Sequence, residues 1–204
     1  MKHCLSPVPF LAALALLTAC ERQEEQATIY APTVAGTILQ FEAFELDNGM
    51  KPNDRLQLRI ANTKHTDDGL EVTYDYSTMQ GNAKATFLCQ QDGGIFQVKA
   101  DRSKDMLLPP GFPDKTTSWQ WNGVTFQVLG RAKANLRGIE LYDPIGVWVE
   151  AIAQFPQPSP LLKGGKWRVL ALPGIGEVET KVLHKGSWVT INRLVGIGTS
   201  TEPM

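Results

Sequence analysis

The stretch Thr117–Val128, TSWQWNGVTFQV, predicts a β-hairpin and is the strongest single indication of the fold. Its centre, Asn122-Gly123, is typical of a two-residue type I′ turn, because both central residues of that turn need a positive φ. A turn here sorts alternate residues onto two faces. One face carries the pairs Trp121 with Val124, Trp119 with Phe126 and Thr117 with Val128, and the other carries Ser118, Gln120, Thr125 and Gln127. This sorting does not depend on the turn residues, so it supports the hairpin independently.

Two further hairpins are predicted in the same way. A turn at Asp92-Gly93 places Cys89 opposite Phe96, Phe87 opposite Val98 and Lys84 opposite Asp101. A turn at Lys185-Gly186 places Val182 opposite Val189, Leu183 opposite Trp188, Thr180 opposite Ile191 and Glu179 opposite Asn192. Alternation of apolar and polar residues predicts additional strands over Leu70–Thr78, Val147–Phe155 and Lys166–Leu172.

The rest of the chain also consists of short runs in which apolar and polar residues alternate. Its 18 glycines and 13 prolines are spread between these runs as turn residues, and no long segment shows helical spacing. We therefore predict an all-β or nearly all-β fold: a strongly curved antiparallel sheet or incomplete barrel, forming a single domain over residues 29–204. Leu107–Pro113 is predicted to be a rigid loop that folds over the open end of this sheet.

The N-terminus predicts export and lipid attachment. A run of about ten apolar residues ends in Leu17-Thr18-Ala19-Cys20, and such a run suits a signal peptide but is too short to span a bilayer roughly 30 Å thick. We predict a lipoprotein signal peptide over 1–19, acylation of Cys20 and a polar tether over 20–28. The alternative is an ordinary secretory signal cut near Ala19. Similarity to other bacterial lipoproteins implies a diacylglycerol thioether on Cys20, often with an amide-linked chain such as palmitate, and Glu21 favours the outer membrane where there is one.

Charge and cysteine content narrow the possible partners. The chain has 20 Lys and Arg against 21 Asp and Glu, and removing residues 1–19 takes away only Lys2. This balance argues against a nucleic-acid partner, which needs a basic face. Of the three cysteines, Cys4 leaves with the signal and Cys20 is acylated, so Cys89 has no disulfide partner. We predict that Cys89 is a small buried hydrophobic residue.

Catalytic and metal-binding patterns are missing from the sequence. His65 lies in a stretch rich in turn residues and His184 beside a hairpin turn, and both are predicted to be solvated. No zinc, serine-hydrolase or nucleotide-binding motif has the required spacing, so no catalytic residue, metal or cofactor is assigned. Among the five tryptophans, Trp119 and Trp121 are predicted to be in the core. Trp148 and Trp188, on mixed faces, are the candidates for ligand contact.

The C-terminal half resembles a family of uncharacterised bacterial envelope lipoproteins. In that family a V-P-A-G-T-F-x-A strand precedes a hairpin with a W-x-A-P-G-x-G-x-V motif. Asp143–Ala151 is similar to the first element and Trp167–Val178 to the second, although Ala171-Leu172 replaces the usual aromatic-Ala pair. The resemblance covers about residues 105–197. It implies a strongly curved antiparallel sheet and no known activity, and such sheets are similar in fold to the half-barrel carriers of lipoproteins.

These observations favour a lipid-anchored envelope protein without enzymatic activity. Our leading hypothesis is a binding or assembly module that takes an apolar ligand or a partner protein in the concavity of its sheet. One alternative is an enzyme that acts on cell-wall glycan through carboxylates such as Glu140 and Glu150. Another is a purely structural lipoprotein.

Overall fold

The computed structural model describes residues 28–44, 52–78, 81–153 and 165–199. The predicted signal peptide, the acylation site Cys20, nearly all of the tether and the proline-rich stretch after residue 154 lie outside these ranges. No helix in the described ranges is long and apolar enough to cross a membrane.

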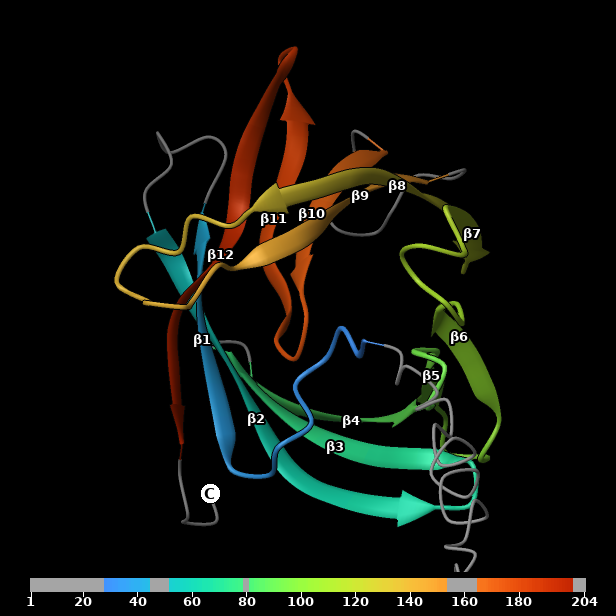
Figure 1. The fold of residues 1–204 in the computed structure, drawn as a ribbon. Coiled ribbons are helices and arrows are strands. Elements are labelled where there is room, and N and C mark those ends of the chain that lie inside the picture. Colours follow the sequence, from blue (N-terminus) through green and yellow to red (C-terminus); the bar gives the residue numbers. More distant parts are fainter. Residues whose placement is uncertain (1–27, 45–51, 79–80, 154–164, 200–204) are drawn as a thin grey trace, which may run out of the picture.

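The described chain is all-β and folds as a single domain (Figure 1). Its twelve strands form one antiparallel sheet, in the order β6-β5-β4-β3-β2-β1-β12-β11-β10-β9-β8-β7. Each half of the sheet is a meander, and β1 joins the two halves by pairing with β12. The strands are β1 (Thr37–Phe44), β2 (Pro52–Thr66), β3 (Gly69–Thr78), β4 (Gly81–Cys89), β5 (Ile95–Val98), β6 (Lys104–Leu108), β7 (Ser118–Trp121), β8 (Val124–Lys133), β9 (Ile145–Ala153), β10 (Lys166–Leu172), β11 (Gly176–His184) and β12 (Ser187–Thr199).

The β7–β8 hairpin has the predicted register. Asn122 and Gly123 adopt φ values of 49° and 72°, as a type I′ turn requires. Trp121 faces Val124 and Trp119 faces Phe126, and the amide of Val128 donates to the carbonyl of Thr117 at 2.8 Å. The prediction from this stretch is confirmed.

The predicted register of the β4–β5 hairpin is wrong by one residue. Cys89 pairs with Ile95, and Phe96 pairs with Leu88. The reason is a longer loop: the amide of Gln90 donates to the carbonyl of Gly94 at 2.8 Å, which leaves three residues in the turn, the last of them Gly93 at φ 84°. Three-residue hairpin loops end in such a left-handed glycine. The predicted pairing of Lys84 with Asp101 is therefore replaced by an ion pair of Lys84 with Asp75 on β3, at 3.4 Å.

The β11–β12 hairpin is confirmed near its turn and wrong further away. Val182 pairs with Val189 as predicted, but Thr180 pairs with Asn192 rather than with Ile191. A β-bulge between Thr180 and Lys181 shifts the register by one residue.

The sheet curves into a nearly closed barrel, as predicted (Figure 1). Its two edge strands, β6 and β7, meet through side chains: the indole N–H of Trp119 donates to the carbonyl of Leu107 at 3.0 Å. The connection between these strands folds inward, and Phe112, only 4% exposed, packs edge-on against Trp119 with ring centroids 5.5 Å apart. The predicted loop over Leu107–Pro113 is confirmed only from Pro109 onward, because Leu107 and Leu108 end β6. The loop that follows seals this seam.

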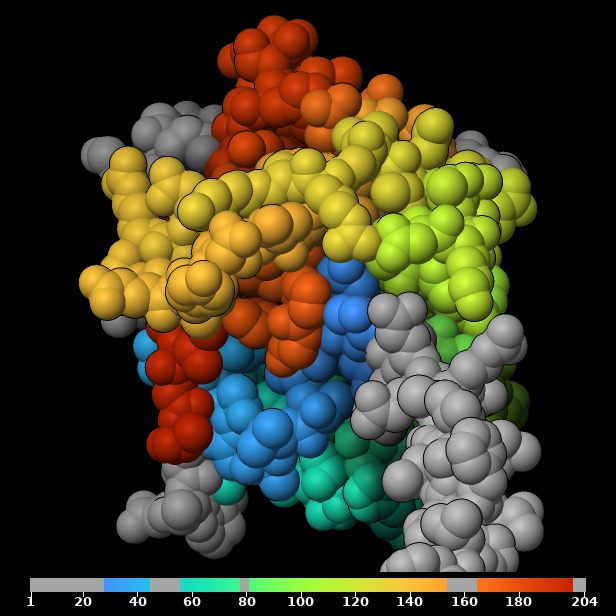
Figure 2. Space-filling view, in the orientation of Figure 1, coloured from blue at the N-terminus to red at the C-terminus, as the bar shows by residue number. Residues whose placement is uncertain are grey.

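Residues 29–32, which we call the strap, run across the inside of the barrel between its two halves (Figures 1 and 2). The carbonyl of Ile29 accepts a hydrogen bond from the amide of Gly174, between β10 and β11, at 2.8 Å. The carbonyl of Pro32 accepts one from the hydroxyl of Tyr74 on β3, at 2.7 Å. Tyr30 is 5% exposed and packs edge-on against Phe112 at 4.9 Å. The strap thus ties the two halves of the sheet together.

Candidate functional site

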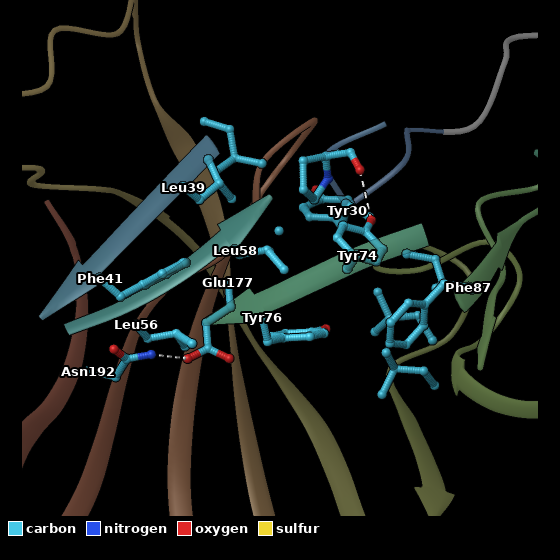
Figure 3. Close-up of a pocket in the computed structure, with 17 residues that line it drawn as sticks. Tyr30, Leu39, Phe41, Leu56, Leu58, Tyr74, Tyr76, Phe87, Glu177 and Asn192 are labelled. Atoms are coloured by element: carbon cyan, nitrogen blue, oxygen red, sulfur yellow. Dashed lines mark hydrogen bonds between the residues drawn. The ribbon is translucent and has the colours of Figure 1, made fainter. Parts of the chain in front are cut away.

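A pocket of about 230 Å³ lies inside the barrel, against the strap (Figure 3). Its wall comes mainly from one face of β1–β4, because alternate apolar residues on these strands point to the same side. The strap, the β10–β11 turn and residues of β5, β6, β11 and β12 contribute the remaining sides. The lining residues are predominantly aliphatic or aromatic: Tyr30, Ala31, Pro32, Leu39, Phe41, Leu56, Leu58, Tyr74, Tyr76, Phe87, Ile95, Leu107, Leu108, Ile175, Gly176, Glu177 and Asn192.

One end of this interior pocket is polar. The exposed carboxylate of Glu177 accepts hydrogen bonds from the amide Nδ2 of Asn192, at 3.1 Å, and from the hydroxyl of Thr180. The amide oxygen of Asn192 is buried, and no group in the described residues donates to it. The pocket therefore presents an apolar body with a negative charge at one end (Figure 3).

The two tyrosines that β3 contributes to the lining, Tyr74 and Tyr76, remain neutral at physiological pH. Burial, and to a smaller extent the Glu177 carboxylate, raises the pKa of Tyr76 to about 12. Burial also raises the pKa of Tyr74, whose hydroxyl donates to the strap. Neither phenol is poised to act as a general base.

The other titratable candidates from the sequence lie elsewhere. Cys89 is 2% exposed, and burial raises its pKa to about 11, so its prediction as a buried hydrophobic residue is confirmed. His65 is exposed, as predicted, but it lies within β2 rather than in the turn. His184 ends β11 beside the hairpin turn. Within the described ranges, no group of three or more His, Cys, Asp or Glu side chains could hold a metal ion.

Trp148 and Trp188, predicted as ligand contacts, line a second pocket of about 310 Å³. Nothing in the sequence indicates that these two tryptophans lie together, because they belong to different strands, β9 and β12. The structure adds three cations that the sequence analysis missed, Arg131 on β8, Arg168 on β10 and Lys181 on β11. We call this the basic pocket, and its lining is Leu129, Gly130, Arg131, Trp148, Arg168, Lys181 and Trp188.

The carboxylates proposed for glycan cleavage have different environments. Glu140 is exposed between β8 and β9, and neither it nor Glu150 lines the interior pocket or the basic pocket. Glu150 is 7% exposed and pairs with Lys166 at 2.9 Å and with Arg168 at 3.0 Å. Burial by itself would raise its pKa, but the hydrogen bonds from these two cations outweigh it and hold the pKa below the usual range. A carboxyl group held ionised in this way is a poor general acid.

The same pairing predicts a pH-dependent loss of stability in Glu150→Gln. Because the folded-state pKa of Glu150 is lowered, its carboxylate stabilises the fold fully above the usual value of 4.5, and this contribution disappears as pH falls below it. We expect Glu150→Gln to be about 1–2 kcal/mol less stable than the wild type at pH 7, with the difference shrinking between pH 4.5 and 3. Urea unfolding across this range measures it, and a difference that stays constant on acidification would contradict the prediction.

The strap was not foreseen as part of the site. The sequence places Ile29-Tyr30-Ala31-Pro32 at the start of the β domain, and only its apolar character directly after a polar tether distinguishes it. No local sequence feature indicates that this segment lies inside the barrel, because its partners Tyr74, Phe112 and Gly174 are far away in sequence.

Comparison with known proteins identifies the fold. No protein-family model and no curated protein matches the chain. Among solved structures, a predicted lipoprotein from Parabacteroides distasonis matches with a TM-score of 0.53 and 12% identity, over 84% of this chain and 99% of that one. A predicted exported protein with a YmcC-like fold from Bacteroides fragilis matches with a TM-score of 0.50 and 14% identity, over 85% and 100%. The chain is therefore similar in fold to two proteins from bacteria, described as a lipoprotein and as an exported protein.

Proposed function

We propose that the protein is a non-enzymatic module of the bacterial cell envelope that binds the apolar chain of a lipid in its interior pocket. The observation that carries this proposal is the pocket itself, which is apolar and bounded by the sheet on one side and the strap on another. Its position in the envelope is supported by the Leu17–Cys20 signal and by the descriptions of the two structural neighbours. Anchoring through acylated Cys20, in the outer membrane of a cell that has one, is part of the proposal.

The size and lining of the pocket favour a single hydrocarbon chain. Pockets for drug-sized ligands range from about 300 to 1,000 Å³, and the interior pocket, at about 230 Å³, lies below that range. Side chains such as Leu56, Leu58 and Phe87 offer no hydrogen bonds, so a chain without polar groups fits them best. Burial of such a chain yields roughly 0.8 kcal/mol for each CH₂ group removed from water.

The predicted anchor would keep the pocket close to its ligand. The strap begins at residue 29, nine residues after Cys20, and a fully extended chain of that length spans at most about 30 Å. A pocket tethered at this distance samples lipid at the membrane surface, which supports a lipid over a soluble metabolite as the ligand.

The polar end predicts which headgroup is accepted. The carboxylate of Glu177 repels a fatty acid carboxylate but accepts hydrogen bonds from hydroxyl groups. We expect monolaurin to bind more tightly than laurate, which has the same chain length. Glu177→Gln should narrow the difference between the two. Calorimetric titration of the purified protein with each lipid measures both affinities.

Filling the pocket tests its role directly. Leu58 is half-buried and faces the pocket, so the indole of Leu58→Trp should occupy the space of the chain. We expect this variant to lose monolaurin binding by roughly tenfold or more while its stability changes by less than about 2 kcal/mol.

Leu141→Trp is the matched control, because Leu141 is 36% exposed on the β8–β9 connection and lies away from the pocket. It should bind monolaurin like the wild type. Native mass spectrometry of the protein extracted from its own membrane should also show a bound lipid. A wild-type protein that carries no lipid and binds neither monolaurin nor laurate would overturn the proposal.

A further inference from the structure

The basic pocket lies on the face of β8–β12 opposite to the buried residues Val147, Val149 and Ala151. Strand register places Glu150, Arg168 and Lys181 in one row across three adjacent strands, each directly opposite the next. Gly130 on β8 pairs with Trp148, and no atom lies within 4 Å of the position that a Cβ would take there. The missing side chain leaves open space beside the indole.

Two like charges face each other in this row. Arg168 and Lys181 are cross-strand partners, and like charges in such positions repel. The carboxylate of Glu150 is already shared by Lys166 and Arg168, while Lys181 has only Glu179, at 3.4 Å, which also accepts a hydrogen bond from Thr190. The third lining cation, Arg131, pairs with Asp114 at 2.8 Å. The described side chains therefore leave one positive charge in excess, shared by Arg168 and Lys181, which are 33% and 30% exposed.

The two tryptophans hold these cations in place. The guanidinium of Arg168 lies 4.0 Å from the ring centroid of Trp188, and the ammonium of Lys181 lies 4.9 Å from that of Trp148. Cation–π contacts of this kind favour fixed positions for otherwise flexible side chains. An anion that bridges Arg168 and Lys181 would meet two donors already in position, which lowers the entropic cost of binding it.

We propose that the basic pocket binds an acidic saccharide, with the carboxylate or phosphate of one sugar residue between Arg168 and Lys181. The volume of about 310 Å³ suits one sugar ring rather than a bare anion. The indoles of Trp148 and Trp188 and the side chain of Leu129 offer apolar surface for the carbon skeleton of the ring. This site is distinct from the interior pocket, and the sugar comes either from a free glycan or from the headgroup of a glycolipid.

Calorimetric titration with two probes tests the chemistry. The purified full-length protein is titrated with trigalacturonate and with neutral maltotriose, which has the same number of sugar rings. We expect binding of trigalacturonate only, weakening as salt is raised, because the contact is ionic. Equal binding of the two probes, or binding of neither, would overturn the proposal.

Two lysine variants on the same face locate the site. Lys181→Gln removes a cation that lines the pocket, and we expect it to weaken trigalacturonate binding by roughly tenfold or more. Lys166→Gln, the matched control, removes a cation that pairs with Glu150 outside the pocket lining, and its affinity should stay within about threefold of the wild type. Thermal unfolding midpoints close to that of the wild type would establish that both variants are folded. Equal losses in the two variants would overturn the assignment of the site.

Vesicles separate the sources of the sugar. Phosphatidylglycerol vesicles carry anionic phosphate without a sugar ring, and vesicles containing lipopolysaccharide carry phosphorylated and carboxylated sugars. If the protein binds lipopolysaccharide vesicles and Lys181→Gln abolishes this binding, the sugar is a glycolipid headgroup. If Lys181-dependent binding is seen with trigalacturonate but not with these vesicles, the sugar is a free glycan. Equal binding of both kinds of vesicle would show that simple anion attraction accounts for the contact and would overturn the saccharide proposal.

Discussion

Trp119→Ala is expected to lower the free energy of unfolding by about 3–5 kcal/mol and the unfolding midpoint by about 10 °C. Trp119 is 8% exposed and belongs to the core cluster that also contains Tyr30 of the strap and Phe112 of the β6–β7 connection. Its ring stacks on Phe126 at 5.1 Å and meets the edge of Phe112 at 5.5 Å. Its N–H also makes the hydrogen bond to Leu107 that joins β7 to β6. Alanine removes all of these contacts at the seam of the barrel.

Trp119→Phe separates the two contributions to closure. It keeps an aromatic ring for stacking but removes the N–H, so the carbonyl of Leu107 loses its partner. We expect a loss of only about 1–2 kcal/mol for this variant, as for one buried hydrogen bond with some loss of packing. Chemical unfolding followed by circular dichroism measures both variants. Equal stabilities of the two variants would show that the hydrogen bond, rather than ring packing, closes the barrel.

Gly69→Ala is the second substitution with a large expected effect, because it combines backbone strain with a steric clash. Gly69 follows the β2–β3 turn at φ 139°, a conformation that L-residues rarely adopt. A Cβ at this position would lie 2.4 Å from the carbonyl oxygen of Cys89, a backbone atom that cannot rotate away. We expect a loss of about 3 kcal/mol or more, and displacement of β4 from β3 near Cys89.

Gly130→Ala is the matched control for this clash. Gly130 has the same φ of 139°, but nothing lies within 4 Å of the position of its Cβ. This variant should therefore show the cost of backbone strain alone, about 1–2 kcal/mol. Thermal unfolding of the two variants side by side gives the cost of the clash by difference. A loss in Gly130→Ala as large as that in Gly69→Ala would show that the clash at Cys89 is relieved.

The geometry of each turn decided whether the register of its hairpin could be predicted from the sequence. The two-residue turn at Asn122-Gly123 admits one register, and all pairs around it were predicted correctly. The three-residue loop ending at Gly93 shares its Asp-Gly signal with a two-residue turn, so the register of β4 and β5 was wrong by one residue. Bulges such as the one after Thr180 have no local signature, because they accommodate the curvature of the whole sheet.

The candidate sites could be predicted only in part. Trp148 and Trp188 stood out because large aromatic residues on mixed faces are unusual, but their cationic partners Arg168 and Lys181 had no distinguishing feature in the sequence. The lining of the interior pocket comes from segments as far apart as Tyr30 and Asn192. Which of these segments meet depends on the order of the strands in the sheet. The alternation of apolar and polar residues along one strand does not specify that order.

Local sequence patterns were enough to predict the all-β class, the positions of most strands and the residue pairs nearest to two-residue turns. These properties depend on short-range chemistry: residues that allow positive φ at turns, and alternation that sorts side chains between two faces. The tertiary structure alone decided how the barrel closes through Trp119 and Leu107, where the strap lies, and which side chains meet in the two pockets. These features arise from contacts between residues distant in sequence, whose geometry is set by the twist, bulges and strand order of the complete sheet.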